Sequence, residues 1–165
     1  MSLTSGSALI RASLSWEQSS TNTGFNSTTQ KGDVSVSLAP STSTYNEVFA
    51  ASYTLAAAGT QTVDLYSITN LLNQSKTITK LIGLIIKATA TVTGGVLKLE
   101  NGASNPLLWP LASGDALSVT VGTAGAVLLF AQGTTHTVSN TAKTLLLTNT
   151  GTQTITVLVA ALVGT

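Results

Sequence analysis

The sequence predicts an all-β protein, a single antiparallel β-sandwich of about eight to ten strands. Short apolar runs alternate with segments rich in Thr, Ser, Asn and Gly. In the second half of the chain these runs recur about every eight to twelve residues with turn signals between them, which is typical of sandwiches and barrels. Two four-stranded sheets in a jelly-roll-like arrangement fit this pattern best. An immunoglobulin-like sandwich is the alternative.

The length of 165 residues favours one domain. We expect residues 1–8 to form an N-terminal arm and residues 9–165 to form a single β-sandwich domain. The core should consist mainly of Leu, Val, Ile and Ala, since hydrophobic residues make up 43% of the chain but aromatic residues only 5%.

The first elements follow from alternation along residues 9–38. Leu9–Trp16 alternates between apolar and polar residues, which predicts a half-buried strand. Residues 17–32 are polar and lack periodicity, so we expect a long loop, either ordered on a neighbour with Phe25 as its anchor or lying loosely on the surface. Val34–Leu38 alternates again and predicts a second strand that stops before Pro40.

Further strands are expected wherever apolar runs lie between turn signals. Residues 68–72 hold apolar side chains three and four positions apart, which fits one helical turn or a loop over the end of the sandwich. Residues 106–110 lie between two prolines, which argues against a central strand. The expected strands are Glu47–Leu55, Thr62–Tyr66, Ile78–Val92, Gly95–Glu100, Ala116–Val121, Ala126–Ala131, Thr135–Val138, Thr144–Thr148 and Thr154–Val163.

Two of these strands are apolar on both faces. Residues 81–86 show little alternation, and in the last strand Leu158 and Leu162 lie on the face opposite Val157 and Val159. One face of such a strand covers the core, and the other must be covered by something else. We therefore predict a homo-oligomer with Leu158 and Leu162 in its interface.

Charged residues are scarce. Asp, Glu, Lys and Arg make up 8% of the chain, against about 25% in an ordinary soluble domain. The formal net charge of +1 is too small to attract nucleic acid. Without cysteine there are no disulfides or thiolate ligands. The apolar runs are too short for a membrane-spanning helix, and no secretory signal is visible, so we expect no membrane partner.

The residues needed for catalysis are not grouped in the sequence. His136 is the single histidine and has no evident partner, so we interpret it as structural. The six acidic residues are not paired at short spacing, and a calcium site from Asp115 near Asn101 is a remote alternative. We expect no enzyme activity, no cofactor and no metal.

Aromatic residues offer one candidate binding feature. Trp109 lies on the proline loop at residues 106–110 and could form a platform for a glycan. Packing in the core or against another subunit is the alternative that we favour. Trp109 and Phe25 therefore join Leu158 and Leu162 as candidate interface residues.

Three segments resemble small all-β virion structural proteins of tailed bacteriophages. "TVDLYSITNLL" precedes the apolar strand "ITKLIGLIIK", "NPLLWPLASGDALSVTVGTAGAVLLF" joins a proline loop, a glycine turn and an apolar strand, and "HTVSNTAKTLLLTNTGTQTITVLVAAL" resembles a closing hairpin. The resemblance covers residues 45–165. It rests on turns and strands and includes no catalytic motif.

The resemblance implies a structural role in a virion. Its decoration (cement) type implies a homotrimer that binds across subunits of the major capsid protein and stabilises the shell, with an arm at residues 1–8 lying on it, with or without the 17–32 segment. Such a protein is made in the bacterial host cytoplasm and ends on the capsid surface. The alternative is a tail or fibre component that binds a receptor or glycan.

Overall fold

The computed structural model describes residues 10–20, 28–38, 47–70 and 73–165, with the backbone alone for residues 10–20, 28–38 and 131–135. These residues form strands and connecting turns, and none of them forms a helix. Consequently no membrane-spanning helix is found within these ranges. The strands are β1 (Ile10–Ser20), β2 (Thr28–Leu38), β3 (Glu47–Leu55), β4 (Thr60–Asp64), β5 (Ser67–Thr69), β6 (Ser75–Thr77), β7 (Lys80–Ala90), β8 (Gly95–Asn101), β9 (Ala116–Val121), β10 (Ala126–Thr137), β11 (Thr144–Asn149) and β12 (Ile155–Gly164).

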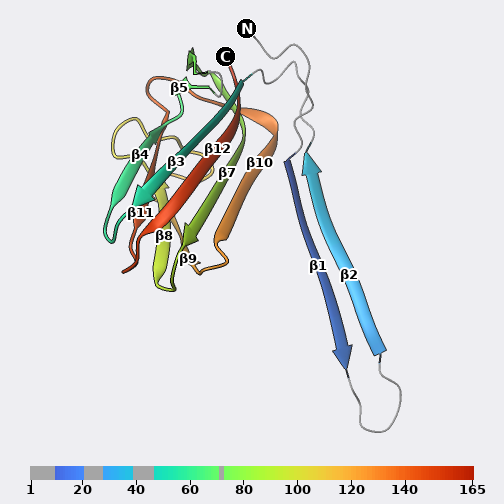
Figure 1. The fold of residues 1–165 in the computed structure, drawn as a ribbon. Helices are drawn as coiled ribbons and strands as arrows, with labels where there is room; N and C mark the ends of the chain where they lie inside the picture. Colours follow the sequence, from blue (N-terminus) through green and yellow to red (C-terminus); the bar gives the residue numbers. More distant parts are fainter. Residues whose placement is uncertain (1–9, 21–27, 39–46, 71–72) are drawn as a thin grey trace.

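Two four-stranded antiparallel sheets form the sandwich (Figure 1). Their strand orders are β10-β7-β12-β3 and β4-β11-β8-β9. Along the chain, β3 and β4, β7 and β8, and β11 and β12 each fall in different sheets, whereas β8 and β9 pair directly. This is the double-sheet jelly-roll arrangement of eight strands. The predicted fold class is confirmed, and the immunoglobulin-like alternative has a different strand order.

The core lies between the two sheets and is built by alternation. On β12, Ile155, Val157 and Val159 are buried and face the second sheet, where Leu97 and Leu147 are also buried. Because side chains alternate along a strand, the intervening residues of β12 must face away from this core. The core is aliphatic apart from Phe49, in keeping with the composition.

The segment predicted as a polar loop over residues 17–32 is strand at both of its described ends, residues 17–20 and 28–32. β1 continues to Ser20 and β2 begins at Thr28, with Glu17 opposite Lys31 and Gln18 opposite Gln30. These strand ends were not predicted because their Ser, Thr and Gln residues show no apolar alternation, although Thr has a high strand propensity. β1 and β2 form a separate two-stranded sheet. The predicted arm at residues 1–8 and Phe25 lie outside the described residues.

Two smaller expectations also change. The predicted strands Ala126–Ala131 and Thr135–Val138 form one strand, β10, whose register against β7 shifts between Ala131 and His136. Gly133 therefore lies in an irregular stretch of one strand and does not separate two strands. Ile68 belongs to β5, which pairs with β6, and not to a helical turn; residues 71–72 are not among those described.

Candidate interaction surface

The outward-facing side of the β10-β7-β12-β3 sheet is apolar. In its central row, Leu129 on β10 lies opposite Ile85 on β7, Ile85 lies opposite Ala160 on β12, and Ala160 lies opposite Ala50 on β3. None of these residues belongs to the core between the sheets. Four apolar residues from four neighbouring strands therefore form a continuous band across the face.

The adjacent row contains two exposed large hydrophobic side chains. Val127 lies opposite Lys87, which lies opposite Leu158, and Leu158 lies opposite Ser52. Val127 is 62% exposed and Leu158 is 40% exposed, both high values for large hydrophobic side chains in strands. Lys87 is the charged residue of this row, and its aliphatic stem can lie along the apolar surface while its ammonium group reaches water.

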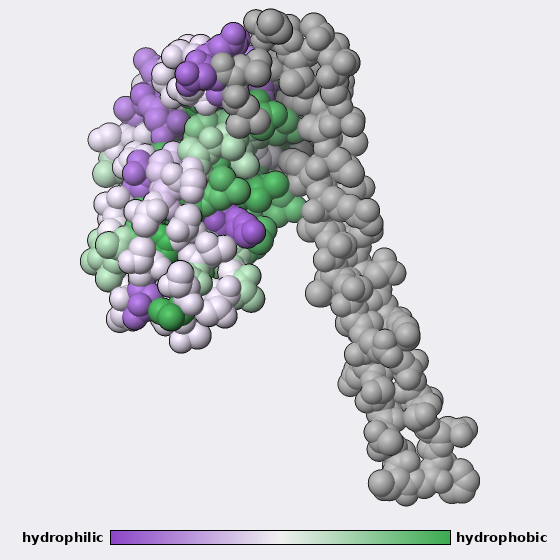
Figure 2. All heavy atoms as spheres, viewed as in Figure 1, coloured by the Kyte–Doolittle hydropathy of each residue, from purple (hydrophilic) through white to green (hydrophobic). Residues whose placement is uncertain are grey.

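The rows on the two sides of this area differ in character. On one side Leu162 lies between Gly83 and Val48 and is only 6% exposed. On the other side a row of threonines, Thr89, Thr156 and Thr54, marks a polar boundary. We call the region formed by Ile85, Val127, Leu129, Leu158, Ala160, Leu162, Val48 and Ala50 the apolar face. Figure 2 shows hydrophobic residues gathered over β12, β7 and β10 on this side of the molecule.

The outward-facing side of the other sheet is mostly polar. Thr62 on β4 lies opposite Leu146, Thr148 on β11 lies opposite Lys98, and Lys98 lies opposite Ser118 on β9. The Lys98 ammonium forms an ion pair of 2.7 Å with Glu100, two residues along the same face. The two outer sides of the described sandwich thus differ, because continuous apolar rows lie on the outer side of the β10-β7-β12-β3 sheet.

The structure brings two of the four candidate interface residues together. Leu158 and Leu162 both lie on the apolar face, separated by Ala160 on β12. Ile85 and Ala160 belong to the two strands that the sequence predicted to be apolar on both faces, whereas Val127 and Leu129 on β10 were not predicted to take part. The absence of alternation in "AVLLFA" at residues 126–131 was the available signal. A strand with apolar residues at both odd and even positions is usually covered on both faces.

Trp109 lies in a different place, in an aromatic cluster at the edge strand β10. Its ring stacks on His136 at 5.9 Å between centroids and meets the edge of Phe130 at 6.3 Å. The ring is partly buried and packs against the core. Burial lowers the pKa of His136, which favours the neutral imidazole in this cluster. Trp109 therefore helps to attach the loop after β8 to β10.

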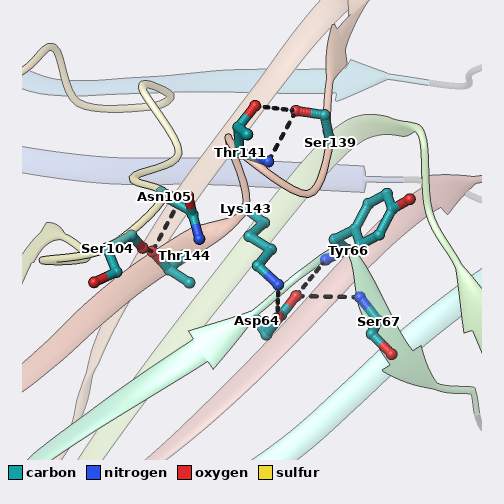
Figure 3. Close-up of polar contacts among 9 residues, drawn as sticks. All are labelled: Asp64, Tyr66, Ser67, Ser104, Asn105, Ser139, Thr141, Lys143 and Thr144. Carbon is teal, nitrogen blue, oxygen red and sulfur yellow. Dashed lines mark hydrogen bonds and ion pairs between the residues drawn. The ribbon is translucent and has the colours of Figure 1, made fainter.

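The carboxylate of Asp64 stabilises the turn after β4. Lys143 forms an ion pair of 2.9 Å with Asp64, whose other carboxylate oxygen accepts the backbone N–H groups of Tyr66 and Ser67 (Figure 3). Burial alone raises the pKa of Asp64, but these partners outweigh it and hold the pKa below its ordinary value. Thr144 beside this pair donates its hydroxyl to the carbonyl of Asn105, which attaches the loop after β8.

The buried carboxylate of Glu47 has a similar structural use. One of its oxygens accepts a hydrogen bond of 2.7 Å from the Asn70 amide, and the other forms an ion pair of 3.0 Å with Lys76. These two interactions attach the start of β3 to the β5–β6 hairpin. Burial alone raises the pKa of Glu47, but the bonds from Asn70 and Lys76 hold it below its ordinary value.

The polar groups considered for calcium lie in a turn. The Asn101 amide donates to the carbonyl of Ala112 at 3.0 Å, and the backbone N–H of Asp115 donates to the same carbonyl at 3.1 Å. Within the ranges that the structure describes, no three acidic or histidine side chains gather as they would around a metal ion. The exposure of Val127 and Leu158 on the apolar face is thus not accounted for by packing within the described part of the chain.

Comparisons with protein-family models, with curated protein sequences and with solved structures found no significant match to this chain.

Proposed function

We propose that this protein is a non-enzymatic structural component of a tailed-bacteriophage virion, most simply a capsid decoration protein. In this role it associates with copies of itself through the apolar face and binds across joints between capsid subunits. Its effect is mechanical, because each joint gains buried area when the protein binds.

The apolar face is the observation that carries the proposal. Burial of apolar surface contributes about 25 cal/mol for each Å² removed from water. Val127 and Leu158 still expose much of their surface in the single chain. Contiguous apolar patches of this kind mark sites of association in soluble proteins. Self-association through this face would increase the total apolar area that is buried, in a protein whose core holds few aromatic side chains.

The use of the charged groups supports a structural role. In the described part of the chain, Glu47 and Asp64 are engaged by lysines and amides that hold turns and strand ends. His136 stacks on Trp109. Each of these groups contributes to the architecture of the sandwich.

The assignment to a virion rests on the resemblance of residues 45–165 to small phage structural proteins. A decoration protein agrees with the chain length and with a surface suited to other proteins. The alternative, a glycan-binding tail module, requires an accessible aromatic platform, and the ring of Trp109 is occupied by His136 and Phe130. We therefore favour the capsid.

Co-sedimentation with capsids tests this function. Particles of the phage that encodes the chain, assembled without it and expanded, are mixed with the purified protein at low and high salt. We expect saturable binding at both salt concentrations and shells that break at a higher temperature, because an interface with few ion pairs is weakly screened. No binding to expanded shells, or binding that is lost at high salt, would overturn the proposal.

The self-association step has its own measurement. Sedimentation equilibrium of the wild type should give a homotrimer, and Leu158→Asp should give a smaller species, because a charge would have to be buried in the interface. Thr120→Asp, on an exposed position of the polar outer side of β9, is the matched control and should remain trimeric. A wild-type monomer at micromolar concentration, or equal behaviour of the two variants, would refute association through this face.

A further inference from the structure

The β1–β2 ribbon has two chemically different faces. Its register places Ile10 opposite Leu38, Ala12 opposite Val36 and Leu14 opposite Val34. Because residues directly opposite one another in an antiparallel pair share a face, these apolar positions lie on one side of the ribbon. The apolar ribbon positions are Ile10, Ala12, Leu14, Trp16, Val34, Val36 and Leu38.

The charged positions of the ribbon all have the opposite parity. Arg11 lies opposite Ser37, Asp33 lies opposite Ser15, and Glu17 and Lys31 lie opposite each other. A surface that covered the apolar ribbon positions would therefore leave these four charges on the outer side. Glu17 opposite Lys31 also places unlike charges across the ladder, which favours this register.

The ribbon needs a partner. β1 and β2 pair with each other and with no other described strand. In Figure 1 the ribbon stands apart from the sandwich and extends beyond its end. A two-stranded ribbon alone is at best marginally stable in water and needs packing against another element.

The same chain contains a surface that suits it. The apolar face spans four paired strands and carries Lys87 as the charge in its exposed row. Two sheets that pack face to face lie about 10 Å apart with apolar side chains between them. Within one chain the β1–β2 ribbon does not stack on the β10-β7-β12-β3 sheet (Figure 1), which leaves each of them available to a neighbouring copy.

We infer that the β1–β2 ribbon of one copy packs its apolar positions against the apolar face of a second copy. This inference rests on the proposed self-association and names the segment that covers the apolar face. The contact joins different surfaces on the two copies, so it is heterologous and closes into a ring when the rotation permits. In a ring of three copies, each ribbon would pack on the next copy, so that every ribbon and every apolar face would be covered.

Cross-linking between tagged copies tests the exchange, and the absence of native cysteine makes each introduced thiol unique. One chain carries Leu14→Cys and a first tag, and the other carries Leu158→Cys and a second tag. The two are co-expressed and treated with a short bismaleimide. We expect a covalent dimer that bears both tags. Val36→Cys, on the neighbouring strand of the ribbon, should replace Leu14→Cys with the same result.

Ser13→Cys is the matched control for ribbon orientation, because it is adjacent to Leu14 but has the opposite parity. It should give much less of the mixed dimer. Equal yields from Ser13→Cys and Leu14→Cys, or no mixed dimer with either Leu14→Cys or Val36→Cys, would overturn the inference.

A single chain that carries both Leu14→Cys and Leu158→Cys distinguishes exchange from folding back. Exchange predicts covalent dimers and larger rings. A product that is cross-linked entirely within single chains would overturn exchange. These results are separable from the capsid assay, since mixed dimers without capsid binding would refute the proposed function and leave the ribbon contact intact.

Discussion

The buried side-chain amide of Asn149, at the end of β11, donates a hydrogen bond of 3.0 Å to the backbone carbonyl of Leu55, at the end of β3. These residues belong to different sheets, so this bond joins the two layers of the sandwich. The same amide nitrogen reaches the carbonyl of Gln153 at 2.7 Å, and the amide oxygen accepts the N–H of Gly151. One side chain therefore organises the turn into β12 and fixes it to the opposite sheet.

Replacement of this amide should be costly. We expect Asn149→Ala to lower the free energy of unfolding by about 2–4 kcal/mol, because several buried polar groups lose partners that cost about 1–3 kcal/mol each to leave unsatisfied. Urea unfolding with an unchanged slope would measure the loss. Thr150→Ala, at the exposed next position, is the control and should change stability by less than about 0.5 kcal/mol. Equal effects of the two substitutions would contradict the role of Asn149 in joining the two sheets.

A glycine in the same turn should be equally intolerant of change. A Cβ atom at Gly151 would overlap the carbonyl oxygen of Gly94 and lie 2.6 Å from the amide nitrogen of Val96. Both are backbone atoms, so no side-chain rotation relieves the overlap. Gly151→Ala should therefore lower the thermal midpoint markedly. Gly122→Ala, where a Cβ would meet nothing within 4 Å, should leave the midpoint unchanged or slightly raised. A midpoint for Gly151→Ala within error of the wild type would show that the turn can move.

Stability should fall on acidification through two identified carboxylates. The pKa values of Glu47 and Asp64 lie below their ordinary values in the folded state. The folded state therefore binds fewer protons than the unfolded state, and the stabilisation is complete above the unfolded pKa of about 4 and is lost as the pH falls through the folded pKa. Urea midpoints measured from neutral to acidic pH should show this decline.

Substitutions at Glu47 and Asp64 test whether these carboxylates cause the loss of stability in acid. Glu47→Gln keeps an acceptor for Asn70 but loses the charge that Lys76 faces, so we expect a loss of about 1.5–3 kcal/mol at neutral pH and a shallower fall in acid. Asp64→Asn should also flatten the acid decline. The double variant should combine both effects, since the sites are on different elements. An acid decline as steep in the double variant as in the wild type would assign it to other groups.

The contact between His136 and Trp109 gives an optical prediction. Burial lowers the pKa of His136, so the stacked imidazole should stay neutral below the ordinary histidine pKa of about 6.5 and become charged at a lower pH. Because the folded pKa is lowered, this group adds stability above about pH 6.5 that is lost as the pH falls through the folded pKa.

Tryptophan fluorescence measures this titration, because a charged imidazole quenches a stacked indole more than a neutral one. A Trp16→Phe background leaves Trp109 as the reporter. We expect a midpoint below pH 6.5, and His136→Gln should abolish the transition. A midpoint at or above the ordinary value would mean that the imidazole is more accessible than the stacked geometry implies.

The sequence predicts the sandwich well because its signals are local. These signals act over a few positions and specify strands and turns independently of the tertiary arrangement. Examples are the alternation around Val157 and Leu97 and the turn residues near Gly94 and Gly151. The apolar character of Leu158 and Leu162 likewise predicted a second covered side of the last strand. Their position on one face follows from the period of two.

Other features depend on pairing between distant segments. The band formed by Leu129, Ile85 and Ala160 exists because β10, β7 and β12 are neighbours, an order that no local pattern encodes. The ribbon ends around Gln18 and Gln30 carry polar residues on both faces, so their strand character arises from cross-strand pairing. Trp109 meets His136 because a loop after β8 returns to the edge of the opposite sheet.

Under the proposed function, the polar outer side of the β4-β11-β8-β9 sheet has a consequence for the particles that would display it. If the apolar face is turned inward, the layer shown to solvent is rich in hydroxyl groups such as Thr62, Thr148 and Ser118, and Lys98 and Glu100 cancel each other's charge at 2.7 Å. Such a layer generates little long-range field. Colloidal stability of the particles would then depend on hydration of the hydroxyl groups more than on mutual repulsion, and their electrophoretic mobility would change little with ionic strength.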